Sequence, residues 1–446
     1  MFPRFGFLAC LPRIKRTTRE LRHPHNPTLF VNWREIALME KRQTTRKPRV
    51  LMLLSSNCFD PDPRVYAEAK ALVEHGYRVL ILAWDRDRKR PAKETIDGID
   101  VERIYLRSTH GRGPTQAFYL LVVLAVFVCK GLFREFDVVH AHDFDALPAG
   151  LVLAGLRRTP LVYDSHEEYA SMLHGNIPGW MERFIRSVES QMLRFVDLLI
   201  TVGEKLRADF ERRGARRTVV VGNWKKLEEY RSNEETRLRV RAELGVPREA
   251  LLIGYIANLG AERHVPELLE VVAERPNIHA VIGGDGQVAE HVREQARLHP
   301  NIHFLGFVNH KRIARYTIAA DVIYYGFDVK HPNAQFSAPN KLFEALATGR
   351  PVISAEFGEI GRIIRENDCG ILLKDFTKQE ISRAFDLCLE PGQLEHWKQR
   401  AGEIGETEYN WTRAEEYLIK AYEGILRNGK SRLSTASAEA KRVPIP

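Results

Sequence analysis

Short apolar runs alternate with amphipathic stretches along most of this chain. Apolar runs of about five residues that are rich in Val, Ile and Leu predict buried strands, and the longer stretches between them predict helices. Buried strands that alternate with helices are typical of a parallel sheet covered on both faces. The first series of expected strands comprises residues 49–55, 78–84, 137–141, 160–164 and 197–202, with a helix expected over 63–75.

The alternation begins again at residue 251. The second series of expected strands comprises residues 251–257, 278–283, 302–306, 321–325, 351–354 and 370–373. Residues 221–232 interrupt the rhythm, and we interpret them as the connection between two doubly wound α/β domains, 48–222 and 223–409. Residues 410–427 predict a further amphipathic helix with Trp411, Tyr417 and Tyr422 among its apolar positions.

The two ends of the chain differ from this pattern. Residues 1–47 contain eleven Lys or Arg against three Glu and therefore carry +8 of the net charge of +9. Two interpretations stay open: a disordered basic arm that touches anionic lipid, or a leader ahead of a start at Met39, in which case residues 1–38 lie outside the catalytic fold. Residues 428–446 are small and polar, and we expect them to be disordered.

Composition excludes several classes of protein. Outside the basic arm the chain is close to neutral, so no nucleic-acid-binding surface is expected. The five cysteines are far apart and form no Cys-x-x-Cys motif, which argues against structural zinc and a disulfide framework and favours a reducing cytoplasm. The apolar run at residues 1–10 is too short for a secretion signal. We therefore expect a two-domain globular protein of the cytoplasm.

The most informative stretch is residues 337–353. Pro339 suits a first helical turn and Gly349 suits the left-handed position after a helix, so a short helix followed by a strand is predicted. Lys341 and Glu344 are three residues apart and share one face of that helix. A cation beside a helix N-terminus suits a diphosphate, and a carboxylate one turn later suits ribose hydroxyls. The alternative is a solvated Lys–Glu pair on the surface.

The sequence of residues 340–353 resembles the donor-site signature of glycosyltransferase family four, which are retaining enzymes of the GT-B fold. The resemblance extends over roughly residues 49 to 426. It implies an α/β protein with two doubly wound Rossmann-like domains facing each other across a cleft, and a helix at 410–427 that crosses back onto the N-terminal domain. Glu344 matches the ribose-binding glutamate of the family. Phe336 replaces the glutamate expected eight positions earlier, so the usual contact to the donor sugar is not implied.

The resemblance also implies the residues that bind the donor. Arg263 and Lys341 would bind the diphosphate and act in catalysis by stabilising the charge that develops on it. A guanidinium can hold a phosphate through two hydrogen bonds. Asn258 occupies the position of a second cation of the family, and His264 occupies that of a glycine. The glycine-rich loop after residue 283 is only weak evidence for a ligand site. The further donor-binding residues implied are Asn340, Gly284, Phe307 and Val308, the last two beside the nucleobase.

Polar residues also gather where two strands of the first domain end, at 139–143 and 163–167. Ligands of doubly wound domains bind beyond these ends. His166 matches the family histidine that approaches the donor sugar, and we predict a catalytic role for it, with His142 and Asp143 as second choices. Arg64 falls in an expected first helical turn, where a cation opposes the helix dipole by about 0.3–1 kcal/mol. This mismatch predicts that Arg64 faces an anion across the cleft, and a solvated arginine is the alternative.

Two Asp-x-Asp motifs occur, at residues 60–62 and 143–145. This motif binds a divalent metal in the other large glycosyltransferase fold, GT-A. Because the sequence resembles GT-B enzymes, which need no metal, we expect no metal and no cofactor.

Residues 117–133 are apolar apart from Lys130. The segment is shorter than the roughly 20 residues that span a bilayer. It is either a helix buried on all sides or a surface helix in a membrane interface, next to Arg112, Lys130 and Arg134.

Taken together, these observations predict a retaining glycosyltransferase that moves a sugar from a UDP-, GDP- or ADP-sugar to a glycan or lipid-linked acceptor, in cell-surface polysaccharide or glycolipid synthesis. The enzyme would be cytoplasmic and attached peripherally to the inner face of the membrane. The leaving phosphate can accept the acceptor proton, so no protein base is nominated. The alternatives are an epimerase or hydrolase of the same fold and a non-catalytic partner that binds a nucleotide sugar.

Overall fold

The structure is a computed structural model that describes residues 46–440 except 61, 109–113 and 232. The expectations for residues 1–38 lie outside these described residues.

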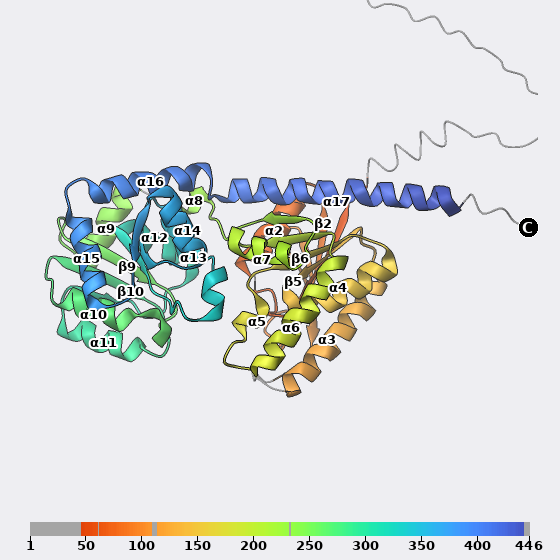
Figure 1. Ribbon diagram of the computed structural model, residues 1–446, viewed down its shortest axis with the longest axis horizontal. Helices are drawn as coiled ribbons and strands as arrows, with labels where there is room; N and C mark the ends of the chain where they lie inside the picture. Colours follow the sequence, from red (N-terminus) through yellow and green to blue (C-terminus); the bar gives the residue numbers. More distant parts are fainter. Residues whose placement is uncertain (1–45, 61, 109–113, 232, 441–446) are drawn as a thin grey trace, which may run out of the picture. The chain divides into compact units, whose positions relative to one another are not determined.

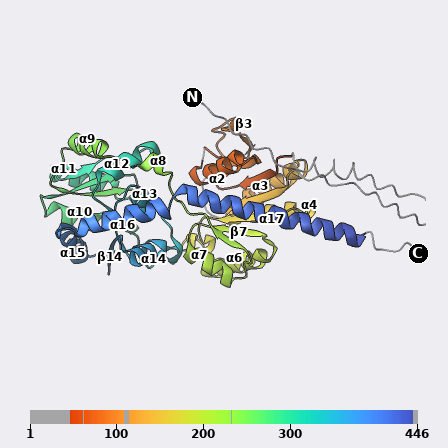
Figure 2. The same cartoon turned by 90° about the horizontal axis from the view of Figure 1, so that it is seen from above.

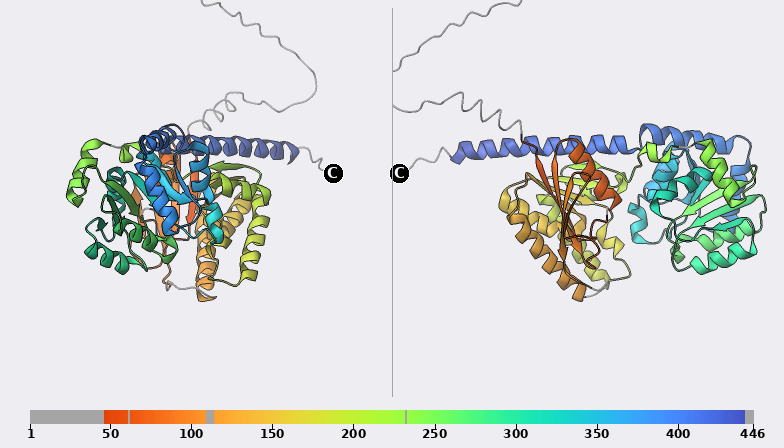
Figure 3. Two further views of the ribbon diagram at one scale, coloured as in Figure 1. Left: turned by 60° about the vertical axis from the view of Figure 1, so that its left-hand side comes forward. Right: turned by 180° about the vertical axis from the view of Figure 1, so that it is seen from behind.

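The first domain is built on an eight-stranded sheet with the order β3-β4-β2-β1-β5-β6-β7-β8. Its strands are parallel except β3, which pairs antiparallel with β4. The strands are β1 Arg49–Leu54, β2 Arg78–Asp85, β3 Lys93–Ile96, β4 Ile99–Tyr105, β5 Val138–His142, β6 Leu161–Ser165, β7 Leu198–Thr201 and β8 Thr218–Val220. Helices cover both faces (Figures 1 and 3): α2 Pro63–Glu74, α3 Pro114–Leu132, α4 Asp143–Arg157, α5 Tyr169–Met172, α6 Gly179–Met192 and α7 Glu204–Arg212.

The second domain has a six-stranded, fully parallel sheet with the order β11-β10-β9-β12-β13-β14. Its strands are β9 Leu251–Ile256, β10 Ile278–Gly283, β11 Ile302–Phe304, β12 Val322–Tyr325, β13 Val352–Ala355 and β14 Gly370–Leu373. Its helices include α8 Leu227–Tyr230, α9 Glu234–Leu244, α10 Val265–Ala273, α11 Ala289–Leu298, α12 Ile313–Ala319, α13 Asn340–Ala347, α14 Gly358–Asn367, α15 Lys378–Leu389 and α16 Gln393–Thr407. Two α/β domains with Rossmann-like parallel sheets confirm the predicted fold class.

Both sheets have a point at which the strand order reverses. In the first sheet this switch lies between β1 and β5, and in the second it lies between β9 and β12. The connections from neighbouring strands leave toward opposite sides at such a point, which opens a crevice where ligands bind. The carboxyl ends of β1, β5, β9 and β12 are therefore the places to search for a site.

The last helix, α17 Trp411–Ala440, follows the second domain in sequence but packs on the first. Its apolar positions Trp411, Leu418 and Tyr422 belong to the core formed by β1, β2 and α2. Figure 2 shows α17 running alongside α2. The helix continues to Ala440, beyond the end at residue 427 that the sequence predicted.

The β3–β4 hairpin and β8 are absent from the strands predicted by hydrophobic pattern. The hairpin contains several charged residues, and two of them are buried within the domain. Arg103 donates to the carbonyl oxygens of Cys58 and Phe59, and Glu102 is paired with Lys130 and Arg134. These partners come from distant segments, so the pattern within 93–105 could not reveal that these charges are compatible with a buried strand.

The apolar segment 117–133 forms most of α3. Val123 and Phe127 are fully buried, whereas Phe118 and Leu121 are 61% and 65% exposed. The alternative of a helix buried on all sides is therefore wrong: α3 has a packed face and an apolar exposed face. Among the described residues, no helix combines the length and apolar character needed to cross a bilayer.

Candidate functional site

Helix α13 presents the predicted donor residues of the second domain. Pro339 precedes its first residue, and Gly349 adopts φ of +65° just beyond its end, as its sequence predicted. Leu342, Phe343 and Leu346 anchor it in the core. Lys341 Nζ donates to Glu344 Oε2 at 2.6 Å, and the Glu344 side chain is buried. The side chains of Lys341 and Glu344 are only 15% and 6% exposed, so the alternative of a solvated surface pair is wrong.

Arg263 lies beyond β9, at the switch point of the second sheet. Its Nη1 donates to the Tyr325 hydroxyl at 2.8 Å, and its guanidinium lies 4.6 Å from the centre of the Phe327 ring. Its Nε is buried and makes no hydrogen bond within the described residues, although Glu262 Oε1 is 3.3 Å away. The side chain is thus held in place by Tyr325 and Phe327.

The other predicted donor residues have different surroundings. Asn340, the first residue of α13, accepts a hydrogen bond at 2.6 Å from Lys225 of the connecting segment. Phe307 is 81% exposed, so its ring is available to a planar ligand, whereas Val308 is half-buried against the core of the second domain. A side chain on Gly284 would place Cβ only 1.9 Å from the Ala257 carbonyl oxygen. Close packing between two loops accounts for this glycine without any ligand.

In the first domain the predicted polar residues lie together at the carboxyl ends of β5 and β6. His166 is one-fifth exposed. Its Nε2 lies 2.7 Å from Asp164 Oδ2, and its Nδ1 lies 3.3 Å from Asp143 Oδ2. The backbone N–H of His166 donates to Asp143 Oδ1 at 3.2 Å. Asp143 adopts φ of +60°, an unfavourable conformation for a residue with a side chain. The predicted His166 and Asp143 are therefore in contact, and the predicted His142 joins them through Asp164 at 3.2 Å.

Arg64 occupies a different environment from the one expected. Its guanidinium binds Asp164 through two hydrogen bonds, of 2.7 and 3.1 Å, and lies 3.0 Å from Glu68. It also donates to the Val221 carbonyl at 2.7 Å. The expectation of an anion across the cleft is wrong, because the anions belong to Arg64's own domain, and the solvated alternative is wrong as well. These carboxylates offset the unfavourable helix dipole.

Several residues of this cluster were not singled out from the sequence. Asp164 is fully buried and accepts from Arg64, His142 and His166. Tyr422 of α17 contacts His140 Nδ1 at 2.8 Å, across 282 residues of sequence. The available signal for Asp164 was its place near the end of β6, two residues before the predicted His166. No local signal pointed to Tyr422 or Glu68.

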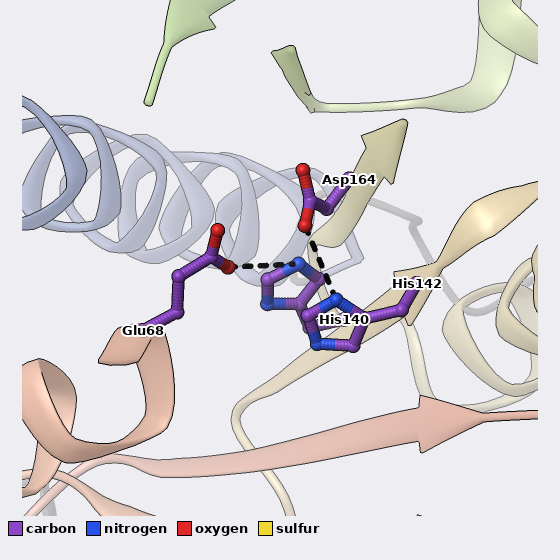
Figure 4. A group of neighbouring side chains, drawn as sticks. All are labelled: Glu68, His140, His142 and Asp164. Atoms are coloured by element: carbon purple, nitrogen blue, oxygen red, sulfur yellow. Dashed lines mark hydrogen bonds and ion pairs between the residues drawn. The ribbon is translucent and has the colours of Figure 1, made fainter. Parts of the chain in front are cut away.

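Figure 4 shows the only group among the described residues whose metal-ligating atoms all lie within 4.8 Å of one another: Glu68, His140, His142 and Asp164. Arg64 already contacts both carboxylates and supplies a positive charge. The rings of His140 and His142 are stacked at 4.2 Å and 26°. Imidazole lone pairs lie in the ring plane, so nearly parallel rings do not aim at one ion. We interpret the four residues as a network of polar and charged side chains in which Arg64 is the cation paired with both carboxylates. Asp143 and Asp145 belong to no such group among the described residues.

The comparisons with known proteins agree with this architecture. The sequence matches two protein-family profiles, described as Glycosyl transferase 4-like domain over residues 61–224 and Glycosyl transferases group 1 over residues 236–404. A relative in Bacillus subtilis, TuaC, is named as a teichuronic acid biosynthesis glycosyltransferase. It is 24% identical over 315 residues, which cover 69% of this chain and 76% of the relative.

Two solved structures illustrate the fold. Sucrose-phosphate synthase from Thermosynechococcus elongatus superposes with a TM-score of 0.69 at 16% identity, covering 86% of this chain and 100% of the other. Anabaena HepE in complex with UDP-glucose superposes with a TM-score of 0.63 at 18% identity, covering 84% and 99%. The two profiles together span most of the chain, and the chain therefore belongs to the group 1 glycosyltransferases, with a Glycosyl transferase 4-like amino-terminal domain and the GT-B fold.

Proposed function

We propose that this protein is a retaining glycosyltransferase that moves a sugar from a nucleoside-diphosphate sugar to an acceptor hydroxyl. The observation that carries the proposal is the Lys341–Glu344 pair at the start of α13, whose carboxylate is buried, in a domain whose switch point bears Arg263. A buried carboxylate with an adjacent ammonium suits the two ends of the ligand: ribose hydroxyls donate to the first, and phosphate oxygens accept from the second.

The same groups would act in catalysis. As the bond between sugar and diphosphate breaks, negative charge grows on the phosphate oxygens. Arg263, Lys341 and the N–H groups that begin α13 are positioned before the reaction starts, which is the condition for electrostatic stabilisation of a transition state. The acceptor would attack from the face that the diphosphate leaves, and its proton would pass to the leaving phosphate. This route retains the configuration of the sugar and uses no protein base.

UDP-glucose is the first donor to test, because the related fold of HepE was solved with it. The exposed Phe307 ring provides a surface for stacking of the nucleobase.

For the acceptor, we propose a lipid-linked or growing glycan at a membrane surface, which is consistent with the name of the relative TuaC. The apolar face of α3 supports attachment to that surface. Beside Phe118 and Leu121, the neighbouring α4 exposes Val152 and Leu156. Arg157 and Arg158 follow directly at the end of α4 and are exposed. Apolar side chains flanked by arginines are typical of surfaces that enter the interface of an anionic membrane.

The decisive experiment compares two substitutions in the second domain. Glu344→Gln removes the charged acceptor of the proposed ribose contact and should weaken UDP binding by about 10- to 100-fold, which corresponds to roughly 1.5–3 kcal/mol. Glu395→Gln is the matched control, because Glu395 is also bonded to a lysine three residues away, Lys398, but is exposed. The affinity of the Glu395→Gln variant for UDP, measured by calorimetry, should equal that of the wild type.

The outcomes separate the alternatives. Equal UDP affinity in Glu344→Gln and wild type would contradict the donor site. Release of free sugar from UDP-glucose at the same rate with and without an acceptor would identify a hydrolase, and conversion of the donor sugar would identify an epimerase. Tight binding without turnover of any donor would identify a non-catalytic partner.

A further inference from the structure

A carboxylate lies beside each ring nitrogen of His166, and these two carboxylates determine the charge of the imidazole ring. Asp164 Oδ2 faces Nε2 at 2.7 Å and Asp143 Oδ2 faces Nδ1 at 3.3 Å. A neutral imidazole carries one N–H and one lone pair, so one nitrogen would then point a lone pair at a carboxylate. Only the doubly protonated ring presents an N–H to both carboxylates.

Asp164 is well suited to hold this ring still. Its carboxylate is fully buried at the end of β6 and accepts hydrogen bonds from three side chains. Arg64 binds it through both Nε and Nη2 and is itself tied to the Val221 carbonyl. A two-point contact to a planar guanidinium fixes the rotation of a carboxylate as well as its position.

We infer that Asp164, fixed by Arg64, is the positioning residue of His166, and that with Asp143 it keeps His166 as an imidazolium in one orientation. His166 then serves the reaction as a fixed positive charge and not as a proton acceptor. This catalytic consequence rests on the proposed function, whereas the charge and orientation of the ring do not.

The charged surroundings support the inference. Burial lowers the pKa of His166, but Asp143 of α4 and Asp164 of β6 outweigh burial and the opposing charge of Arg64 on α2, and the pKa rises to about 9. Arg64 and His166, in turn, lower the pKa of Asp164 well below its usual value in spite of its burial. Other titratable groups that interact with His166 include His140 and His142 on β5, Glu68 on α2, and Glu167, the next residue. His166 should therefore stay charged throughout the neutral range and lose its proton only as the pH passes about 9.

The first measurement needs no enzyme activity. In full-length protein labelled with carbon-13 at histidine Cε1, the His166 signal can be assigned by its disappearance in His166→Gln and then titrated. We expect a pKa near 9 in the wild type, a clear fall in Asp164→Asn, and a smaller fall in Glu68→Gln. The Glu68 variant is the matched control, because Glu68 is also a buried carboxylate beside Arg64 but does not contact His166.

The second measurement is kinetic. Transfer from the donor should be constant from neutral pH to about pH 8.5 and decline as His166 loses its proton above that. Asp164→Asn should lower kcat on the order of 10- to 100-fold with a much smaller change of KM, and the decline should move to lower pH. In Glu68→Gln the decline should stay near that of the wild type.

The inference can fail separately from the proposed function. A His166 pKa near 6.5 in the wild type, or no change of it in folded Asp164→Asn, would overturn the inference whether or not transfer is observed. Should Asp164→Asn not fold, Asp143→Asn provides the same test at the other ring nitrogen, since Asp143 is partly exposed. Absence of transfer with a His166 pKa near 9 would reject only the proposed function.

Discussion

His264 is a residue whose backbone conformation is unfavourable but whose side chain makes compensating contacts. It adopts φ of +53° and ψ of 34°, a left-handed conformation that glycine accepts with little penalty, and it stands where the resembling family has glycine. Its ring stacks on Phe376 at 4.4 Å and 13°, and its Nδ1 lies 3.2 Å from Glu267. These contacts offset the strain of the backbone.

A pair of substitutions separates the backbone strain at residue 264 from the contacts that the His264 ring makes. His264→Gly and His264→Ala both lose the ring, but only alanine retains the left-handed strain. We expect His264→Gly to be more stable than His264→Ala by about 1 kcal/mol, and close to the wild type because strain and stacking cancel. Urea denaturation of the three proteins measures the difference. Equal stability of the two variants would show that the backbone at this position is not strained.

Helix α3 shows how one element can serve the fold and a surface at once. Val123 and Phe127 fill the core of the first domain, while Phe118 and Leu121 project from the opposite face. Lys130 and Arg134, expected to attract lipid, are both paired with Glu102. Arg157 of α4, which bonds to the Leu132 carbonyl at the end of α3, is a better candidate for that contact.

Leu121→Glu tests whether this face enters a membrane. The full-length protein should float with anionic liposomes at low salt, and the substitution should reduce its affinity by about tenfold, the value of one buried leucine side chain. Leu298→Glu on α11 is the matched control, because Leu298 is also highly exposed but belongs to the second domain. Leu124 is unsuitable because it packs against the core.

The Leu121→Glu and Leu298→Glu variants should both keep the melting temperature of the wild type. Repeating the flotation with a chain that starts at Met39 removes most of the basic arm and isolates the contribution of α3. Equal binding of Leu121→Glu and wild type in that shortened chain would contradict the membrane role of this face.

For the molecule as a whole, positive charge is distributed between the two switch points. We propose that Arg263 and Lys341 of the second domain bind the diphosphate of the donor. In the first domain Arg64 and His166 are paired with the buried Asp164. We propose that, with these charges in place, neither the reaction nor the buried network requires a divalent ion.

Removal of metal should therefore leave most of the activity intact. We expect the rate of transfer after treatment with EDTA to match that of untreated enzyme, with no gain from added Mn²⁺ or Mg²⁺. Loss of activity with EDTA and its recovery with Mn²⁺ would show that a metal takes part. Substitution of Glu68 or Asp145 would then distinguish the buried network from the Asp-x-Asp motif.

Much of the architecture was predictable because it depends on local periodicity. The runs at 49–55 and 278–283 are mostly apolar, and each forms an interior strand that pairs in parallel with its neighbours. The short helix α13 was equally clear, since Pro339 and Gly349 mark its two ends. Lys341 and Glu344 had to share a face because they are three residues apart on a helix.

Tertiary structure decided what these residues contact and how deeply they are buried. Whether the Lys341–Glu344 pair is solvated depends on neighbours that pack from other segments, and no helical pattern contains that information. Arg64 meets Asp164 across 100 residues, and Tyr422 meets His140 across 282. Local sequence sets the conformation of each element, but the charge of His166 follows from carboxylates on separate elements, which only the assembled sheet and helices bring to its two nitrogens.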